Sequence, residues 1–308
     1  MDLVSNLIFL DRLQEAGKTA QQAIAGGKDS AYLHLGIYRL AFLENDTFEM
    51  ARQAELVAGH PDPEAKMFEL QARTAAYYGH VKESRNLWRR AVGSAMRAEE
   101  SELAANYEAQ GVLQEALFEN IPEVRLQSKA SLGTPTGKIP QFARALNFAF
   151  AGDTTHAQLL ADDLAKRYPA DTLVLFNLVP TIRAQIALSR HDPTKAIDIL
   201  QVAAPYELSN HLWWGFLGPV YVRGEAYLMA HQGTEAANEF QKILDHRGIV
   251  DNSPTGALAH VQLGRAFTLK GDNARAKAAY NQFLALWKDA DPNIPILQQA
   301  RVEYAKLK

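Results

Sequence analysis

Residues 256–297 read GALAHVQLGRAFTLKGDNARAKAAYNQFLALWKDADPNIPIL, and the spacing of a few positions in this stretch decides the fold. A small residue, an aromatic, a turn glycine, an alanine and a second aromatic follow one another at Gly264, Phe267, Gly271, Ala276 and Tyr280. About 40 residues earlier, a distance typical of helical repeats, the same order stands at Gly224, Tyr227, Gly233, Ala236 and Phe240. Two further units are marked by Ala184, Ala187, Ala196 and Leu200 and by Ala145, Phe148, Gly152, Ala157 and Leu164. Four units therefore share one period, which indicates a repeat protein.

Each unit is predicted to form two helices joined by a tight turn. In residues 144–171, RALNFAFAGDTTHAQLLADDLAKRYPAD, one apolar stripe ends at Gly152 and a second ends before Pro169. Asp153 or Thr154 is expected to cap the second helix. Small residues where two helices cross let the backbones approach, and the aromatic residue is expected to fill the space towards the next unit. Because no window shows the alternation of a strand, we predict an all-α fold.

The N-terminal half carries the same pattern more weakly. Gly79 with Trp88 marks one unit, Asn120 marks a turn, and Leu35-Gly36 marks another unit. The first unit has only a short stub of its first helix. The count is about eight helix pairs in one solenoid over residues 1–308. Within it we expect divergent units in 1–127, a possible hinge loop at 128–141, and clearer units in 142–308.

Composition narrows the classes of partner. The net charge is −3 and the isoelectric point is near 6.3, which gives no global electrostatic support for nucleic-acid binding. Cysteine is absent, so thiolate metal sites and thiol nucleophiles are excluded. Runs without charged residues, such as 172–182 and 209–222, fall short of the roughly 18 residues that span a bilayer. We expect no membrane insertion and no signal peptide.

Motifs that resemble catalytic or nucleotide sites fail at the positions that carry chemistry. In LDHRGIVDN, residues 244–252, Gly248 stands where a kinase catalytic loop needs its aspartate, so this stretch is expected to end a helix. In GTPTGKIP, residues 133–140, one spacer is missing and Ile139 replaces the hydroxyl of a phosphate-binding loop. The nine histidines have no metal-site spacing. The cluster Glu99-Glu100-Glu102 is interpreted as a solvated helix start. The sequence therefore predicts neither an enzyme nor a metal or cofactor site.

The repeat units resemble the tetratricopeptide repeat. Leu263-Gly264 with Phe267, and Ala276 with Tyr280, match its L-G-x2-Y and A-x3-F positions, although the period is longer than 34 and tryptophan is missing at the unit start. The resemblance implies a right-handed superhelical solenoid in which the first helices of the pairs line a concave surface that binds peptides. The lysine and asparagine array with which some members of the family hold a C-terminal carboxylate is absent.

A narrower resemblance covers nearly the whole chain. Phrases such as GPVYVRGEAYL, EFQKILDHRGIV and QARVEYAKLK are similar to the C-terminal repeat region of bacterial serine/threonine protein kinases of the eukaryotic type. The resemblance implies that a kinase domain precedes the repeats in the parent architecture and that the repeats act in sensing or regulation. No kinase motif is present, so no catalytic residue is carried over. The implied compartment is cytoplasmic, or periplasmic if a membrane helix precedes the repeats.

The resemblance also selects candidate partner-binding residues on the first helices. In the clear units the inward positions are Phe142, Leu146, Thr181, Gln185, Tyr221, Glu225, Val261 and Arg265, and the weaker units add Arg73, Tyr77, Gln110 and Gln114. The aromatic loop 206–221, with Trp213 and Trp214, is interpreted as packing, with partner anchoring as the other reading. We predict a non-catalytic scaffold that binds a protein or peptide. The alternatives are a structural spacer or self-association module, and an enzyme with its site in the 206–221 loop.

Overall fold

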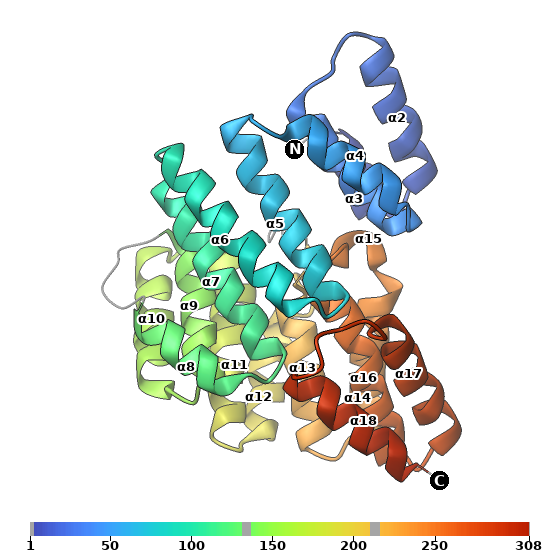
Figure 1. The fold of residues 1–308 in the computed structure, drawn as a ribbon. Coiled ribbons are helices and arrows are strands. Elements are labelled where there is room, and N and C mark those ends of the chain that lie inside the picture. Colours follow the sequence, from blue (N-terminus) through green and yellow to red (C-terminus); the bar gives the residue numbers. More distant parts are fainter. Residues whose placement is uncertain (1–2, 131–136, 210–215, 308) are drawn as a thin grey trace.

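The structure, a computed structural model, describes residues 3–130, 137–209 and 216–307 (Figure 1). These residues form helices and turns, with no strand among them, which confirms the all-α prediction. The helices are α1 (Leu3–Phe9), α2 (Leu13–Ala25), α3 (Ala31–Glu44), α4 (Thr47–Val57), α5 (Pro61–Tyr77), α6 (Val81–Arg97), α7 (Ser101–Leu117), α8 (Ile121–Ala130), α9 (Lys138–Phe150), α10 (Thr154–Arg167), α11 (Val179–Ser189), α12 (Pro193–Leu200), α13 (Gly218–Met229), α14 (Gly233–Asp245), α15 (Arg247–Val250), α16 (Pro254–Leu269), α17 (Asn273–Leu286) and α18 (Pro295–Lys306). A π-helical turn, η1 (Val174–Leu178), precedes α11, and a 3₁₀ turn, η2 (Gln201–Ala203), follows α12.

The turns within the hairpins form where the sequence predicts them. Gly79, Gly152 and Gly271 adopt the left-handed conformation that ends a helix. The Asp153 carboxylate then accepts a hydrogen bond from the His156 amide and caps α10, so Asp153 rather than Thr154 is the N-cap. Asp272 caps α17 in the same way, by accepting from the Arg275 amide. Local sequence therefore sets the boundaries of these hairpins.

Two predicted turn residues have other roles. The left-handed position before α14 belongs to His231, and the one before α8 belongs to Glu119, not to Gly233 or Asn120. Gly233 begins α14, where a Cβ would lie 2.6 Å from the Ala266 carbonyl oxygen of α16. Close packing of these two helices, rather than backbone conformation, therefore requires glycine at 233.

Small residues at the helix crossings have the predicted role, with one difference. A Cβ on Gly264 would lie 2.7 Å from the Tyr280 ring, and one on Gly224 would lie 2.6 Å from the Phe240 ring. Both rings are buried. Each aromatic residue therefore packs on the glycine of its own hairpin, whereas the sequence analysis placed it against the next unit.

Successive hairpins pack on their neighbours along the chain, as in an α-solenoid. Within hairpins, α5 packs on α6, α9 on α10 and α16 on α17; between hairpins, α7, α9, α11 and α13 pack in succession. Both ends of the predicted hinge at 128–141 are helical, because α8 continues to Ala130 and α9 begins at Lys138. No helix in the described ranges is both long and apolar enough to cross a bilayer.

The N-terminal and C-terminal halves also contact each other directly, which periodicity does not predict. Helix α5 packs on α16 and α1 packs on α15, so the blue N-terminal part of the chain meets the orange helices α15 and α16 in Figure 1. Arg39 of α3 forms a buried ion pair with Asp251, which follows α15. Asn252 donates to the Leu70 carbonyl at 2.8 Å, and the Trp287 indole donates to the Tyr77 carbonyl at 2.9 Å. We call these contacts between the two halves the closure.

Candidate functional site

Six of the predicted partner-binding residues are buried in the interior. These are Arg73, Gln110, Gln114, Thr181, Gln185 and Tyr221. Gln114 accepts hydrogen bonds from Ser84 and from the Trp88 indole, and the Thr181 hydroxyl donates to the Asn177 carbonyl within its own helical segment. The closure and the tight stacking of first helices cover the positions that an open solenoid would expose. Phe142, Leu146 and Val261 are likewise core residues.

Tyr77, Glu225 and Arg265 are half-buried, and the last two belong to a charged cluster with Tyr221. The Arg265 guanidinium reaches Glu303 at 3.1 Å and Glu119 at 3.0 Å, and the Tyr221 hydroxyl accepts from Gln262 at 3.1 Å. Burial, together with the negative charge of Glu119, raises the pKa of Glu225 to about 8. The charged groups of this cluster are paired, because the Arg265 guanidinium lies beside the carboxylates of both Glu119 and Glu303. The ion pairs of Arg265 therefore join α16 to α18 and to the turn that follows α7.

Glu225 should make stability depend on pH. Its pKa is raised, so the folded protein keeps the proton between pH 4.5 and about 8 while the unfolded chain loses it. The free energy of unfolding therefore falls across this window, by up to about 1.4 kcal/mol per pH unit. We expect Glu225→Gln, measured by urea denaturation across the window, to gain stability over the parent as pH rises. A constant difference at all pH values would contradict the raised pKa.

The aromatic loop is only partly described. Trp213 and Trp214 lie outside the described residues. On either side of them, Tyr206 stacks on Phe176 with ring centroids 5.0 Å apart, and Phe216 is buried 6.3 Å from the Tyr221 ring. The described ends of the 206–221 segment therefore pack against the helices.

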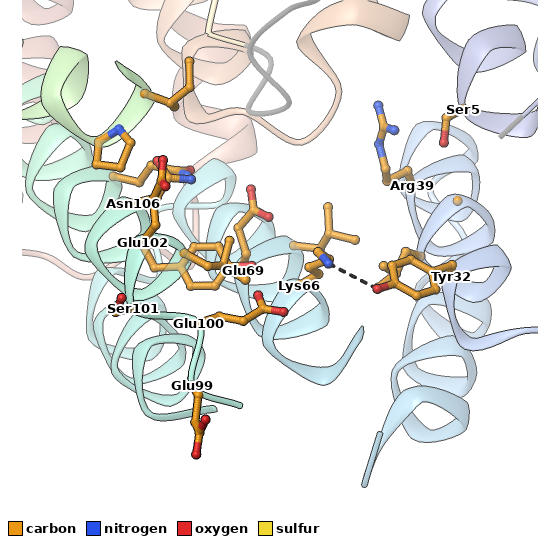
Figure 2. Close-up of a pocket in the computed structure, with 18 residues that line it drawn as sticks. Ser5, Tyr32, Arg39, Lys66, Glu69, Glu99, Glu100, Ser101, Glu102 and Asn106 are labelled. Carbon is orange, nitrogen blue, oxygen red and sulfur yellow. Dashed lines mark hydrogen bonds between the residues drawn. The ribbon is translucent and has the colours of Figure 1, made fainter. Parts of the chain in front are cut away.

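A hollow of about 970 Å³ opens between α3, α5 and α7. Figure 2 shows Tyr32 and Arg39 on the α3 side, Lys66 and Glu69 from α5, and Glu100, Glu102 and Asn106 on the α7 side. The remaining lining is Ser5, Leu35, Gly36, Leu70, Glu99, Ser101, Leu103, Tyr107, Gln110, Ile139 and Pro140. Its volume is at the upper end of the roughly 300–1,000 Å³ found for ligand sites. Of the predicted residues, only Gln110 lines it.

The carboxylates of the hollow outnumber its cations, and the cations are already paired. Lys66 Nζ lies 2.6 Å from Asp62 and 3.4 Å from the Tyr32 hydroxyl, and Arg39 pairs with Asp251. Within the described part of the chain, no cation forms an ion pair with Glu99, Glu100 or Glu102. Their side chains leave the entrance of the hollow negative.

The depth of the hollow holds polar groups that the described protein leaves unsatisfied. Tyr107 and Gln110 are 1% and 5% exposed, and neither the Tyr107 hydroxyl nor Gln110 Nε2 has a hydrogen-bond partner among the described residues. Asn106 Oδ1 is also buried and without a partner there. Burial raises the pKa of Glu69, whose nearest cation is Arg73 at 3.4 Å. A buried polar group without a partner costs about 1–3 kcal/mol, so these groups favour an incoming polar ligand.

A second, smaller cavity of about 30 Å³ shares Gln110 with the hollow and brings it together with Arg73, Gln114, Trp88 and Ser253. It has the volume of about one water molecule. Across the described ranges, no group of three His, Cys, Asp or Glu side chains is placed to hold a metal ion. Neither observation adds a site beyond the hollow.

Comparison with protein-family models and with curated proteins finds no match to this chain.

Most of the hollow could not be predicted from the sequence, because its residues come from five hairpins and from the turn between α6 and α7. One signal was present. Glu99, Glu100 and Glu102 form the acidic cluster that was assigned to a solvated helix start, and α7 does begin at Ser101. The same cluster also borders the hollow, which the sequence does not reveal.

Proposed function

We propose that this chain is a non-catalytic scaffold that binds a segment of a partner protein in the hollow between α3, α5 and α7. The observation that carries the proposal is the hollow itself, which combines about 970 Å³ of space with apolar walls and unsatisfied buried polar groups. Mostly apolar lining with a few polar groups is typical of binding sites. The binding surface we propose is thus confined to the N-terminal end of the stack, whereas the sequence analysis extended it along the whole inner face.

The finer identity of the scaffold is also part of the proposal. We assign about eight tetratricopeptide-like pairs with a right-handed superhelix, acting as the regulatory region of a bacterial serine/threonine kinase. The 40-residue register and the stacking of first helices support the repeat assignment. The kinase association rests on the sequence resemblance alone.

Filling the hollow should abolish binding without unfolding the protein. Asn106 is half-buried on α7 and lines the hollow, so Asn106→Trp is expected to occupy it. An array of short synthetic peptides probed with the full chain identifies ligands, and fluorescence anisotropy then measures their affinity. We expect the variant to lose at least about tenfold in affinity, which corresponds to about 1.4 kcal/mol.

The matched control is Asn238→Trp, which makes the same replacement on the exposed face of α14. It should bind as the parent does, and circular dichroism should show both variants folded. If Asn106→Trp leaves binding unchanged, the hollow is not the site. If no peptide binds the parent, the result favours the alternative of a structural spacer or self-association module. Light scattering then tests self-association.

A further inference from the structure

We propose that the partner segment that enters the hollow carries an arginine or lysine flanked by apolar residues. This inference rests on the proposed function, because it assigns the chemistry of the ligand for the same site. The occupant to which we commit is an extended segment of another protein, not a nucleic acid or a lipid surface. Three independent features of the lining support it.

Charge is the first feature. Glu69, Glu99, Glu100 and Glu102 line the hollow, whereas its two cations are paired with Asp62 and Asp251. Figure 2 shows Glu100 near Glu69 and Glu99 farther from both. Glu69 pairs with Arg73, whereas Glu99, Glu100 and Glu102 have no ion-pair partner within the described residues, so a cationic side chain entering here meets these three carboxylates. Phosphate groups would meet the same carboxylates and be repelled.

The apolar walls are the second feature. Leu35 and Leu70 contribute from α3 and α5, Leu103 contributes from α7, and Ile139 and Pro140 contribute from the start of α9. Leu70 and Pro140 are buried, and the other three are half-buried. Side chains that cover these walls gain about 25 cal/mol for each Å² of apolar surface removed from water. A free inorganic or small organic cation would leave the walls uncovered, so apolar neighbours of the cation are required.

Unsatisfied buried amide and hydroxyl groups are the third feature. Gln110 Nε2 is a donor, Asn106 Oδ1 is an acceptor and the Tyr107 hydroxyl is both, and all three lack partners among the described residues. The peptide backbone offers one carbonyl acceptor and one amide donor at each residue. An extended peptide supplies both kinds of partner, whereas an isolated side chain of one polarity does not.

The test uses three synthetic peptides of one length and one apolar pattern, taken from the array described above. They differ at one position, which is arginine, its neutral isostere citrulline, or glutamate. We expect the full chain to bind the arginine peptide most tightly and the glutamate peptide least. Added salt should reduce the difference between arginine and citrulline, because it screens charges near the surface.

Two variants locate the charge effect. Glu100→Gln should weaken the arginine peptide by about two- to fivefold, the range expected for a pair of partly exposed charges, and should leave the citrulline peptide unchanged. Glu99→Gly should weaken it in the same way while the protein becomes more stable. Glu99 is exposed at φ +60, in the left-handed region where other turns of this chain use glycine. Loss of affinity in a stabilised protein excludes unfolding as its cause.

The control is Glu235→Gln, because Glu235 lies at the start of α14 as Glu100 lies at the start of α7. It should bind all three peptides as the parent does. The charge proposal is overturned if citrulline or glutamate peptides bind as tightly as arginine peptides, or if Glu100→Gln is silent. If Asn106→Trp still blocks binding of the citrulline or glutamate peptides, the hollow remains the binding site although the charge proposal fails. If Asn106→Trp blocks the binding of no peptide, both the proposed site and the proposed ligand chemistry are overturned.

Discussion

Replacing Asp251 with asparagine is expected to destabilise the protein by about 3–5 kcal/mol, because it leaves the Arg39 guanidinium buried without its counter-charge. The two side chains are 1% and 8% exposed, so the pair is largely shielded from water. Asp251 also adopts φ +55, and asparagine tolerates positive φ better than most residues. The change therefore isolates the charge. Urea denaturation followed by circular dichroism measures the free energy of unfolding.

Two further variants, compared with Asp251→Asn, show how much of its effect comes from the unpaired buried charge. Arg39→Met combined with Asp251→Asn removes both charges and should recover much of the loss, because neither charge is left unpaired in the interior. Asp162→Asn breaks the ion pair of Asp162 with Arg183, in which both side chains are about half exposed, and should change stability by less than about 1 kcal/mol. Equal effects of Asp251→Asn and Asp162→Asn would show that the closure contributes little to stability.

Truncation of Trp287 should have an effect of similar size, about 3–5 kcal/mol for Trp287→Ala, through the cavity it leaves. Trp287 is completely buried, with its ring centroid 5.3 Å from that of Phe118 and 4.7 Å from that of Phe283. Its indole also donates to the Tyr77 carbonyl, so the variant breaks a contact between residues 210 positions apart. Chemical denaturation again gives the magnitude.

Trp287→Phe separates packing from hydrogen bonding. It keeps an aromatic ring and leaves the Tyr77 carbonyl without its donor, so the expected loss is smaller, about 1–3 kcal/mol. Gly79 leaves room for the Trp287 ring, because a Cβ there would lie 2.9 Å from it. A loss below about 1 kcal/mol for Trp287→Ala would show that the halves are held together elsewhere.

Local features of the fold were readable from the sequence because they depend on neighbours a few residues apart. The turn at Gly152, the cap at Asp153 and the glycine opposite Tyr280 each follow from one pattern of small, apolar and capping residues. The stretch 244–252 does end a helix, since α14 stops at Asp245. Where two residues can fill one role, as with His231 and Gly233, the prediction was displaced by two positions.

The candidate site was less predictable, for a geometric reason. Assigning Tyr221, Gln185 and Gln114 to a binding surface assumed an open inner face, and all three are buried. Whether that face is open depends on small rotations between hairpins that add up along the stack. The register fixes which side of a helix faces inward but not how far the stack curves.

By itself, then, the sequence determined the helical class, most hairpin boundaries and the stacking of neighbours. Tertiary structure alone decided that Arg39 meets Asp251 across 212 positions and that space remains between α3, α5 and α7. Helix periodicity acts over three or four residues, where chain connectivity limits the geometry. Contacts between distant hairpins are set by the packing of the whole stack, and no short pattern records them.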